Sequence, residues 1–338
     1  MQDAEKYMSH CIQLAKRGLG HVNPNPLVGC VIVKNGKIIS EGWHRAVGQN
    51  HAERMAILGI DDKTQFKDAD LYVNLEPCSH FGRTPPCANL IVEHSFKRVF
   101  VGYGDPNPLV SGSGIQLLEN HGIEVVQNIL VEDCLQLNRF FYTFHHLKRP
   151  FVTLKWAETL DGFMAPEPLS RIQISGSDSQ FYTHNLRAQH SAILVGVSTW
   201  EIDKPKLNNR LDFGTDPLKM VLDPKLRGSY EDVQSRMIVF NFYINQQTEM
   251  VEYVMIDPKN MVDSILNFMF KHQLNSLLVE GGAQTLDLFL NACKVDEIHQ
   301  YVSQNIVFSK GLKAPEHQLN LSQTIQLQSD IYKIYRKQ

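Results

Sequence analysis

Four residues in the first half of the chain are of the types, and in the order, that hydrolytic metal chemistry needs. His51 and Glu53 form a His-Ala-Glu triplet, Cys78 follows a proline, and Cys87 follows a pair of prolines. One imidazole and two thiolates are ligands that zinc prefers, and three protein ligands leave the fourth tetrahedral position open. The donor set therefore predicts a catalytic zinc bound by His51, Cys78 and Cys87.

Glu53 is the predicted catalytic residue of this site. Residues two apart on a helix do not face the same way, so we expect His51 at or just before the first helical residue, where both side chains can reach one metal. Bound zinc lowers the pKa of water to about 7, and a carboxylate beside it can move protons. His-x-Glu followed by Pro-Cys is the signature of zinc deaminases, in which hydroxide attacks a ring carbon that bears an amine. A helix N-terminus also lowers a thiol pKa, which favours Cys87 as a thiolate.

The alternative is a structural zinc, which would need a fourth ligand, and His80 is the near candidate. It would also leave Glu53 without a role. The other thiols and one histidine pair are more typical of core positions than of ligands: Cys11, Cys30, Cys134, Cys293, His145 and His146.

The segment between the two cysteines is longer than the Cys-x-x-Cys of deaminases that act on cytosine or on tRNA adenine. Residues 79–86 read Ser-His-Phe-Gly-Arg-Thr-Pro-Pro. An arginine and two hydroxyls beside the metal would suit a phosphorylated or polar substrate, with Arg83 as the charged contact.

The elements that must hold these residues alternate between helix and strand, which predicts a layered α/β fold. Asn35-Gly36 between two apolar runs predicts a hairpin. In the first half we expect helices at 3–17, 51–58, from 85, 115–120 and 131–146, and strands at 28–33, 38–42, 71–75 and 98–102. In the second half we expect strands at 151–155, 192–196, 219–222 and 276–280, and helices at 179–188, 261–272 and from 283 to 290. Lys148-Arg149-Pro150 predicts a boundary between domains 1–147 and 148–338.

The second half carries weaker signals of chemistry. It contains neither Gly-x-Gly-x-x-Gly nor a Walker A sequence. A strand that leads into Gly281-Gly282 and a helix could offer free backbone N–H groups to an anion, although the residues alone favour an ordinary turn. Asp212-Phe213-Gly214 is interpreted as a polar turn.

Composition excludes several classes of protein. The chain has 338 residues, a formal charge of −3, 43% hydrophobic and 20% charged residues, which is typical of globular domains and not of disordered chains. The charge balance does not favour a nucleic-acid binder, and no apolar run is long enough for a membrane span. The start lacks a secretion signal and the six cysteines are scattered, so we expect a cytoplasmic protein without disulfides. The sequence does not decide between a monomer and a homo-oligomer.

Several stretches together resemble the bifunctional riboflavin-biosynthesis deaminase/reductase family. They are Asn23–Cys30 (Asn-Pro-Asn-Pro-Leu-Val-Gly-Cys), His51-Ala-Glu53, Glu76–Cys87 and Asp105–Val110. The long segment between the cysteines separates this family from other zinc deaminases. The resemblance implies a cytidine-deaminase-like zinc domain, a mixed sheet with helices, followed by a dihydrofolate-reductase-like α/β domain.

What the resemblance implies for the second half is a reductase that uses NADPH. Substrate contacts carried over from the family are Asn25 in the first domain and Arg187, Leu207, Arg210 and Glu280 in the second. Thr199, Asp203, Gly281 and Gly282 would bind NADPH, and Lys155 or Asp203 would polarise or protonate the sugar. Two departures bear on cofactor affinity: Lys204 stands where many relatives have Asp, and Gln173 stands where they have a Trp.

The implied function is two consecutive steps on a phosphoribosyl pyrimidine. A diaminopyrimidinone ribosylamino phosphate would be deaminated with zinc, and its ribosyl chain would then be reduced to ribityl. One alternative is a nucleobase or nucleoside deaminase with an inactive second domain. The other is a non-catalytic module that binds zinc and a nucleotide.

Overall fold

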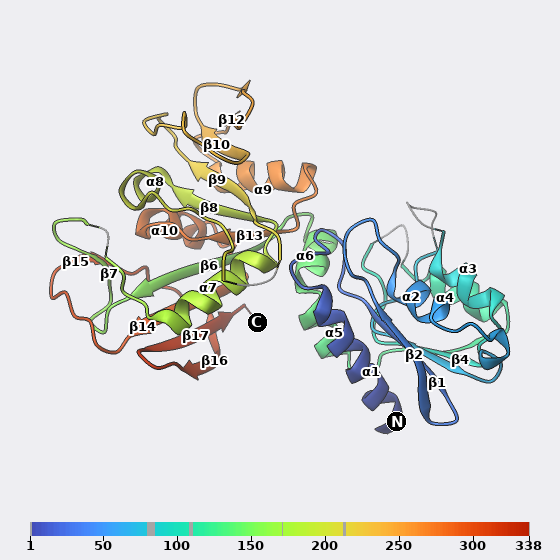
Figure 1. Ribbon diagram of the computed structural model, residues 1–338. Coiled ribbons are helices and arrows are strands. Elements are labelled where there is room, and N and C mark those ends of the chain that lie inside the picture. Colours follow the sequence, from blue (N-terminus) through green and yellow to red (C-terminus); the bar gives the residue numbers. More distant parts are fainter. Residues whose placement is uncertain (1, 80–84, 108–110, 171, 212–213, 338) are drawn as a thin grey trace. The chain divides into compact units, whose positions relative to one another are not determined.

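The computed structural model describes residues 2–79, 85–107, 111–170, 172–211 and 214–337. Within these ranges the chain separates into two compact units, Met1–Lys148 and Arg149–Gln338. Figure 1 shows a sheet with helices in each unit. No helix in the described ranges is long and apolar enough to cross a membrane.

Unit 1 is built on one mixed sheet with the strand order β2-β1-β3-β4-β5. β1 is antiparallel to β2 and β3, whereas β3, β4 and β5 are parallel. The strands are β1 (Gly29–Lys34), β2 (Lys37–Trp43), β3 (Asp70–Val73), β4 (Arg98–Val101) and β5 (Glu124–Val126). The α-helices are α1 (Gln2–Ala15), α2 (Ala52–Leu58), α3 (Cys87–Glu93), α4 (Ser113–Asn120), α5 (Val131–Leu137) and α6 (Arg139–Leu147), with 3-10 turns at Lys16–Gly18 and Lys63–Gln65.

Helices cover both faces of this sheet because its strands are apolar on both sides. Cys30 and Ile32 pack into the core that contains α2, α3 and α4. Their neighbours Val31 and Val33 point the other way, into the core that contains α1 and α5. This alternation is the two-residue period of a strand, and it places α2 and α3 on one face.

The hairpin prediction is confirmed and the prediction of one closing helix is wrong. Asn35 and Gly36 both have positive φ, 52° and 72°, as a two-residue primed turn needs. The expected helix at 131–146 is divided at Asn138 into α5 and α6. The Asn138 side chain accepts from Leu27 N–H at 2.8 Å and donates to Leu27 O at 3.0 Å, so it ties the chain at Leu27 to the helix break.

Unit 2 contains a sheet with the order β11-β12-β10-β9-β8-β13-β6-β14-β17-β16. The strands from β12 to β14 are parallel, and β11, β17 and β16 pair antiparallel with their neighbours. The strands are β6 (Phe151–Glu158), β8 (Ala192–Gly196), β9 (Leu218–Leu222), β10 (Met237–Asn241), β11 (Gln246–Gln247), β12 (Val251–Met255), β13 (Ser276–Val279), β14 (Glu297–Ser303), β16 (Asn320–Gln326) and β17 (Asp330–Arg336). A separate two-stranded ribbon joins β7 (Phe163–Pro166) and β15 (Gly311–Lys313).

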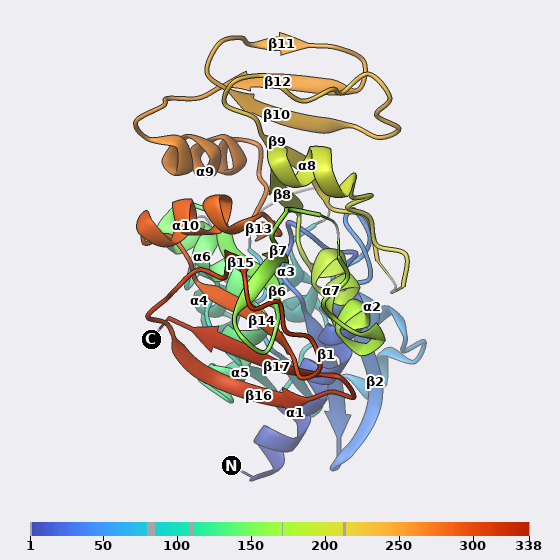
Figure 2. The ribbon, with the colours of Figure 1, turned by 90° about the vertical axis from the view of Figure 1, so that its left-hand side faces the viewer.

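Helices again lie on both faces of the sheet. They are α7 (Ser177–Gln189), α8 (Val197–Asp203), α9 (Met261–Lys271) and α10 (Ala283–Asn291). Leu194 packs with α9 and α10, whereas its neighbour Val195 packs with α7 and α8. In Figure 2 the strands β12, β10 and β9 and the helix α9 occupy one end of this unit, and β17 and β16 the other.

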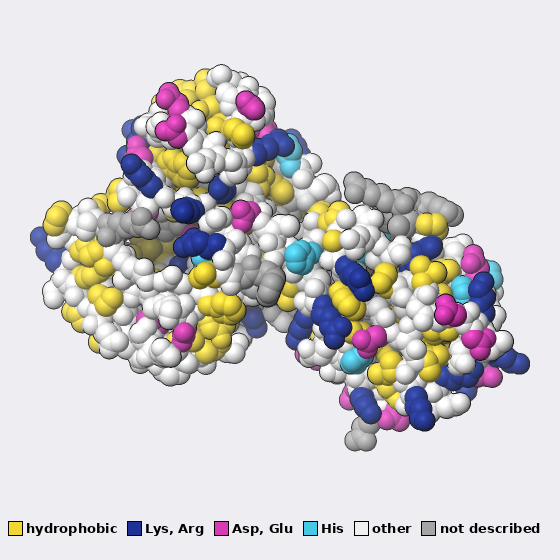
Figure 3. Space-filling model, in the orientation of Figure 1, with side chains coloured by type: hydrophobic (Ala, Val, Ile, Leu, Met, Phe, Trp, Pro, Cys, Tyr) yellow, Lys and Arg dark blue, Asp and Glu magenta, His cyan; other side chains and the backbone are white. Residues whose placement is uncertain are grey.

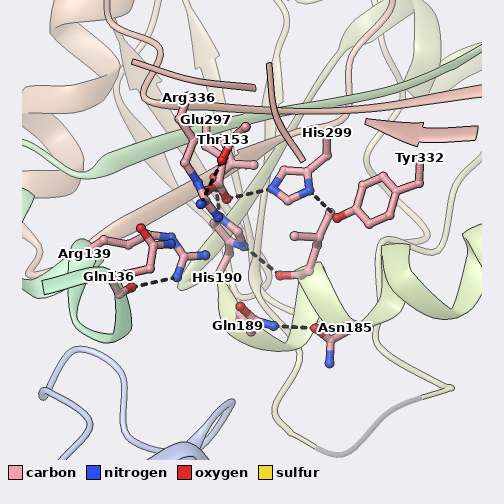
Figure 4. Close-up of polar contacts among 12 residues, drawn as sticks. Gln136, Arg139, Thr153, Asn185, Gln189, His190, Glu297, His299, Tyr332 and Arg336 are labelled. Carbon is pink, nitrogen blue, oxygen red and sulfur yellow. Dashed lines mark hydrogen bonds and ion pairs between the residues drawn. The ribbon is translucent and has the colours of Figure 1, made fainter. Parts of the chain in front are cut away.

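Two buried carboxylates connect β14 and β17 to their surroundings. Glu297 lies 2.7 Å from His299 Nε2 and accepts from Arg336 Nε at 2.8 Å, and Figure 4 shows His299 between Glu297 and Tyr332. Asp330, at the start of β17, accepts from Gly176 N–H at 2.8 Å and from the Ser179 hydroxyl. The first turn of α7 is therefore held by a carboxylate from the last strand.

Two of the residues interpreted as core positions do not lie in the core. Cys293 and His146 are exposed, whereas Cys11, Cys30 and Cys134 are buried. Cys293 follows α10 with a φ of 55°. It ends a helix at the surface, which an isolated cysteine in the sequence does not reveal.

Candidate active sites

Three element ends bring His51, Cys78 and Cys87 together in unit 1. His51 is the extended residue immediately before α2, with φ −68° and ψ 163°, so the expected place of His51 is confirmed. Cys78 follows β3 by a short loop, and Cys87 is the first residue of α3. One ligand atom from each of the three lies within 4.8 Å of the other two.

The distances in this cluster fit a tetrahedral metal. His51 Nδ1 lies 3.5 Å from Cys78 Sγ and 3.4 Å from Cys87 Sγ. Zinc–sulfur bonds of about 2.3 Å and zinc–nitrogen bonds of about 2.0 Å at a tetrahedral angle place N and S about 3.5 Å apart. The donors therefore fit zinc, with Nδ1 as the histidine ligand.

The thiols of Cys78 and Cys87 differ in pKa. The Cys87 thiol, together with His51 and despite burial, brings the pKa of Cys78 to about 4. Cys87 also donates its backbone N–H to Cys78 Sγ at 3.4 Å. The pKa of Cys87 is raised by its hydrogen bond to Cys78 and by burial. Cys78 is thus the more acidic thiol of the pair.

Glu53 is a buried carboxyl beside the three candidate ligands, with 3% of its surface exposed. Burial raises the pKa of Glu53, the Cys78 thiolate raises it further, and His51 acts in the other direction. A raised pKa makes the carboxyl hold a proton more readily, as a general acid–base residue must. Gly42 on β2 lets α2 come this close, because a Cβ there would lie 2.4 Å from Ala52 O.

Asn25 lies beside this cluster and is held by a residue that the sequence reasoning missed. Its amide Nδ2 lies 3.2 Å from His44 Nε2, and His44 Nδ1 lies 3.2 Å from Asn50 O. The rings of His44 and His51 are 5.4 Å apart at 79°. Burial, which lowers the pKa of His44, keeps this ring neutral. The available signal was a second histidine seven positions before His51.

Glu76 was also missed, although it stands in the Glu-Pro-Cys stretch. Its buried carboxylate accepts from backbone N–H groups of Asp105 (3.2 Å), Gly112 (3.0 Å) and Gly114 (2.9 Å). It therefore ties the strand that leads to Cys78 to the loop before α4. The predicted contact Arg83 and the alternative ligand His80 lie outside the described residues, as does part of 105–110 and of the triplet at 212–214.

All nine residues that the resemblance selected in unit 2 line one cavity of about 420 Å³. They are Lys155, Arg187, Thr199, Asp203, Leu207, Arg210, Glu280, Gly281 and Gly282. The cavity is of a size that is usual for small ligands. Figure 3 shows a hollow on this face of unit 2, with Lys and Arg side chains at its edge.

The sheet explains why residues so far apart in sequence meet here. β8, β13 and β6 are neighbours and run parallel, so their carboxyl ends lie at one edge. Lys155 lies in β6, Val195 in β8, and Glu280 directly follows β13. Ligands of open α/β sheets bind at such an edge.

Arg187 and Glu280 form a two-pronged ion pair inside the cavity wall. Arg187 Nε donates to Glu280 Oε1 at 2.7 Å and Nη2 to Oε2 at 2.8 Å, while Nη1 reaches Asn208 O at 3.2 Å. Burial alone would raise the pKa of Glu280, but the Arg187 charge outweighs it and the pKa is about 2. The pKa of Lys155 is lowered by burial against the opposing effect of Glu280.

The glycine pair before α10 is less free than the sequence suggests. Gly282 N–H donates to Thr199 Oγ1 at 3.1 Å, so this donor is already used. A Cβ on Gly281 would lie 2.6 Å from Thr285 Cβ, which explains the need for glycine at that position. Gln173 also lines the cavity and donates to Ser175 O at 3.2 Å.

Comparison with known proteins connects the two sites. The family model of the cytidine and deoxycytidylate deaminase zinc-binding region matches residues 1–103, and that of the RibD C-terminal domain matches residues 150–323. Riboflavin biosynthesis protein RibD of Actinobacillus pleuropneumoniae is 39% identical over 91% of this chain and 86% of its own. The corresponding protein of Aquifex aeolicus is 38% identical over 90% and 87%.

Solved structures agree along the whole chain. A diaminohydroxyphosphoribosylaminopyrimidine deaminase/5-amino-6-(5-phosphoribosylamino)uracil reductase from Thermotoga maritima has a TM-score of 0.91 at 38% identity, covering 99% of both chains. RibD of Acinetobacter baumannii has a TM-score of 0.90 at 33% identity, again over 99% of both. With a zinc-type cluster in one unit and a ligand cavity in the other, the chain belongs to the RibD family of bifunctional riboflavin-biosynthesis deaminase/reductases.

Proposed function

We propose that this enzyme deaminates 2,5-diamino-6-ribosylamino-4(3H)-pyrimidinone 5′-phosphate and then reduces 5-amino-6-(5-phosphoribosylamino)uracil with NADPH, using the residues named below. The observation that carries the proposal is the meeting of His51, Cys78 and Cys87 beside the buried Glu53. We assign deamination to residues 1–147 and reduction to residues 148–338.

In the deaminase, His51, Cys78 and Cys87 hold zinc and Glu53 moves protons. Zinc bound there supplies the Lewis acidity that makes water a nucleophile at neutral pH. A Glu53 carboxylate oxygen takes a proton from the attacking water and passes it to the neighbouring ring nitrogen. It then carries the remaining hydroxyl proton to the departing amine nitrogen, so that ammonia leaves and a ring carbonyl remains. Asn25 and Arg83 bind the substrate, and the neutral His44 fixes the Asn25 amide.

In the reductase, Thr199, Asp203, Gly281 and Gly282 bind NADPH, which supplies a hydride. The contacts with the ribosyl phosphate come from Lys155, Arg187, Leu207, Arg210 and Glu280. Lys155 is the side chain that we propose to protonate or polarise the sugar, since burial favours release of its proton. Asp203 is the second candidate for this role.

The two departures from the family pattern concern NADPH affinity. Gln173 lines the cavity but offers no aromatic face for stacking. Lys204 follows α8 with a φ of 41°. We propose that both change cofactor affinity and leave the reaction unchanged.

The decisive experiment is incubation of the diaminopyrimidinone phosphate with the purified enzyme, with and without NADPH. Ammonia release should occur in both samples, and loss of NADPH should follow deamination. Ammonia release without any NADPH oxidation would identify a single-activity deaminase. If the enzyme neither released ammonia nor oxidised NADPH, a non-catalytic binding module would be the remaining interpretation.

Zinc content tests the ligand assignment independently of activity. Wild type should bind one zinc per chain, and Cys87→Ala should lose it, because two protein ligands hold zinc far less tightly than three. Cys11→Ala is the matched control, since Cys11 is also a buried thiol of unit 1 but donates to Tyr72 O at 3.3 Å. Metal analysis after dialysis against a weak chelator decides it. Stoichiometric zinc in Cys87→Ala, with loss in Cys11→Ala, would show that the wrong thiol was assigned.

We also propose that the enzyme works in the cytoplasm on small-molecule substrates. All six cysteines are free, and thiolate ligands need a reducing compartment to stay available. Whether the enzyme acts as a monomer or a homo-oligomer is open to measurement by light scattering.

A further inference from the structure

His184 is a buried histidine of the reductase cavity that the proposed mechanism does not use. Only 2% of its surface is exposed, and it lines the cavity. It lies on the same face of α7 as three other wall residues, Gln180, Thr183 and Arg187. Their separations of three and four positions are those of one helix face. α7 therefore presents a continuous polar stripe to the cavity.

The contact made by His184 determines which ring nitrogen carries the proton. Nδ1 lies 3.2 Å from the main-chain N of Arg210. A backbone N–H can only donate, so Nδ1 must accept and the ring proton is on Nε2. Burial, together with the charges of Arg187 and Arg210, brings the pKa of His184 to about 4. The ring is therefore neutral and able to accept at physiological pH.

The segment that His184 holds, residues 204–210, is attached to the rest of unit 2 by individual contacts. Residues 204–210 form neither helix nor strand, so regular backbone hydrogen bonds do not fix them. Leu207 anchors the segment in the core with 1% exposure and a φ of 51°. Beyond Leu207, Asn208 O accepts from Arg187, Asn209 N–H donates to Asp216 Oδ1 at 2.7 Å, and Arg210 N–H donates to His184. Arg187 and His184 lie on α7.

Arg210 is the residue whose placement depends on this attachment. Its side chain lines the cavity, and Nη1 reaches Asn208 Oδ1 at 3.3 Å. This side-chain contact is with its own segment, so it does not fix the guanidinium relative to α7. The main-chain bond to His184 attaches Arg210 itself to α7, next to the bond between Arg187 and Asn208 O.

We propose that His184 is a positioning residue of the reductase: it fixes the main chain at Arg210 so that the guanidinium meets an oxygen of the phosphoribosyl substrate. This proposal rests on the proposed reduction. It adds His184 to the residues on which the affinity for the substrate depends. The oxygen belongs either to the phosphate or to a ribosyl hydroxyl. Comparison of the phosphorylated substrate with its dephosphorylated form tells these two apart.

The first experiment compares two replacements of similar size. His184→Asn keeps a short side-chain acceptor for the Arg210 N–H, whereas His184→Leu removes it. A neutral hydrogen bond contributes enough for about a two- to tenfold change in an equilibrium constant. His184→Leu should therefore raise the KM of reduction by about that factor with kcat little changed, and His184→Asn should restore most of it. If both variants keep the wild-type KM, or both raise it equally, the proposal is wrong.

A double-mutant cycle tests whether His184 acts through Arg210. In an Arg210→Ala background the guanidinium is gone, so His184→Leu should cause no further rise in KM. Additive effects of the two changes would overturn the proposal, because they would give His184 a separate role. The cycle compares Arg210→Ala with the double variant that also carries His184→Leu. If His184→Leu impaired folding in general, kcat would fall as well as KM rise.

Two controls show whether a negative result contradicts the role of His184 or the proposed function itself. Ammonia release by the same preparations reports on unit 1, which none of these changes touches. NADPH binding, followed by fluorescence, should be unchanged in His184→Leu. If wild type fails to oxidise NADPH, the proposed reduction itself is wrong. If wild type reduces its substrate and His184→Leu does so with the same KM, only the role of His184 fails.

Discussion

Replacement of Glu53 by Gln is expected to abolish ammonia release while zinc binding and NADPH-dependent reduction of the deaminated substrate survive. The amide matches the carboxylate in shape but cannot take up and return a proton. General acid–base catalysis contributes about 10²- to 10⁴-fold, which sets the smallest expected loss in kcat. Glu53 is buried beside Cys78 and Cys87, so bulk water cannot easily replace it as a proton carrier.

The Glu53→Gln experiment contains its own controls. Zinc per chain, measured on the same sample, shows whether the three ligands are intact. NADPH oxidation with the deaminated uracil substrate shows whether the second site works. Near-normal ammonia release from a zinc-loaded Glu53→Gln enzyme would remove Glu53 from the mechanism.

Arg187→Ala is expected to impair the reductase in two ways. Charge-assisted hydrogen bonds contribute about 1.5–3 kcal/mol, so the loss of contacts to substrate and to Asn208 O should lower kcat/KM of reduction roughly ten- to a hundredfold. The change also leaves Glu280 without its partner, and both side chains are about one-tenth exposed (12% and 10%). Breaking a buried pair in this way costs about 3–5 kcal/mol of stability.

Kinetics and thermal unfolding together separate these two effects. Arg236→Ala is the matched control, since Arg236 pairs with Glu252 at 3.2 Å but is 67% exposed, and such surface pairs contribute about 0–1 kcal/mol. Deamination should be unchanged in both variants. Wild type should prefer the phosphorylated over the dephosphorylated substrate. An Arg187→Ala enzyme with the same preference would show that Arg187 supports Glu280 and does not bind the phosphate.

The elements that the sequence predicted well are those with strong local signals. Asn35-Gly36 specified its hairpin, and a helix begins directly after Pro86. The break at Asn138 was not predicted because it depends on hydrogen bonds to Leu27, and the residues on either side are typical of a helix. β16 is a polar, largely exposed edge strand, whose sequence Asn-Leu-Ser-Gln-Thr-Ile-Gln has no apolar face that would reveal it.

In the candidate sites, too, residues with a strong local signal could be predicted and residues that depend on distant contacts could not. The cluster of His51, Cys78 and Cys87 could be predicted because an imidazole, two thiols and a carboxylate stand in the order of a known signature. His44, Glu76 and His184 could not, because each acts through hydrogen bonds to residues distant in sequence or to the backbone. The Arg187–Glu280 pair joins positions 93 residues apart. Arg187 lies on α7, which leads into β8, and Glu280 directly follows β13, the neighbour of β8 in the sheet.

The hydrogen bonds between Asp330 and the first turn of α7 affect the order in which the two units can be completed during synthesis. Gly176 must wait for a partner 154 residues further along, which at about 5–20 residues per second takes the ribosome about 8 to 30 s. In unit 1 Leu27 waits for Asn138, 111 residues further along, and all strands of this unit lie before Lys148. We therefore expect a nascent or prematurely terminated chain to complete unit 1 while unit 2 still lacks its last strand. The two consecutive activities would become available during synthesis in the order in which the pathway uses them.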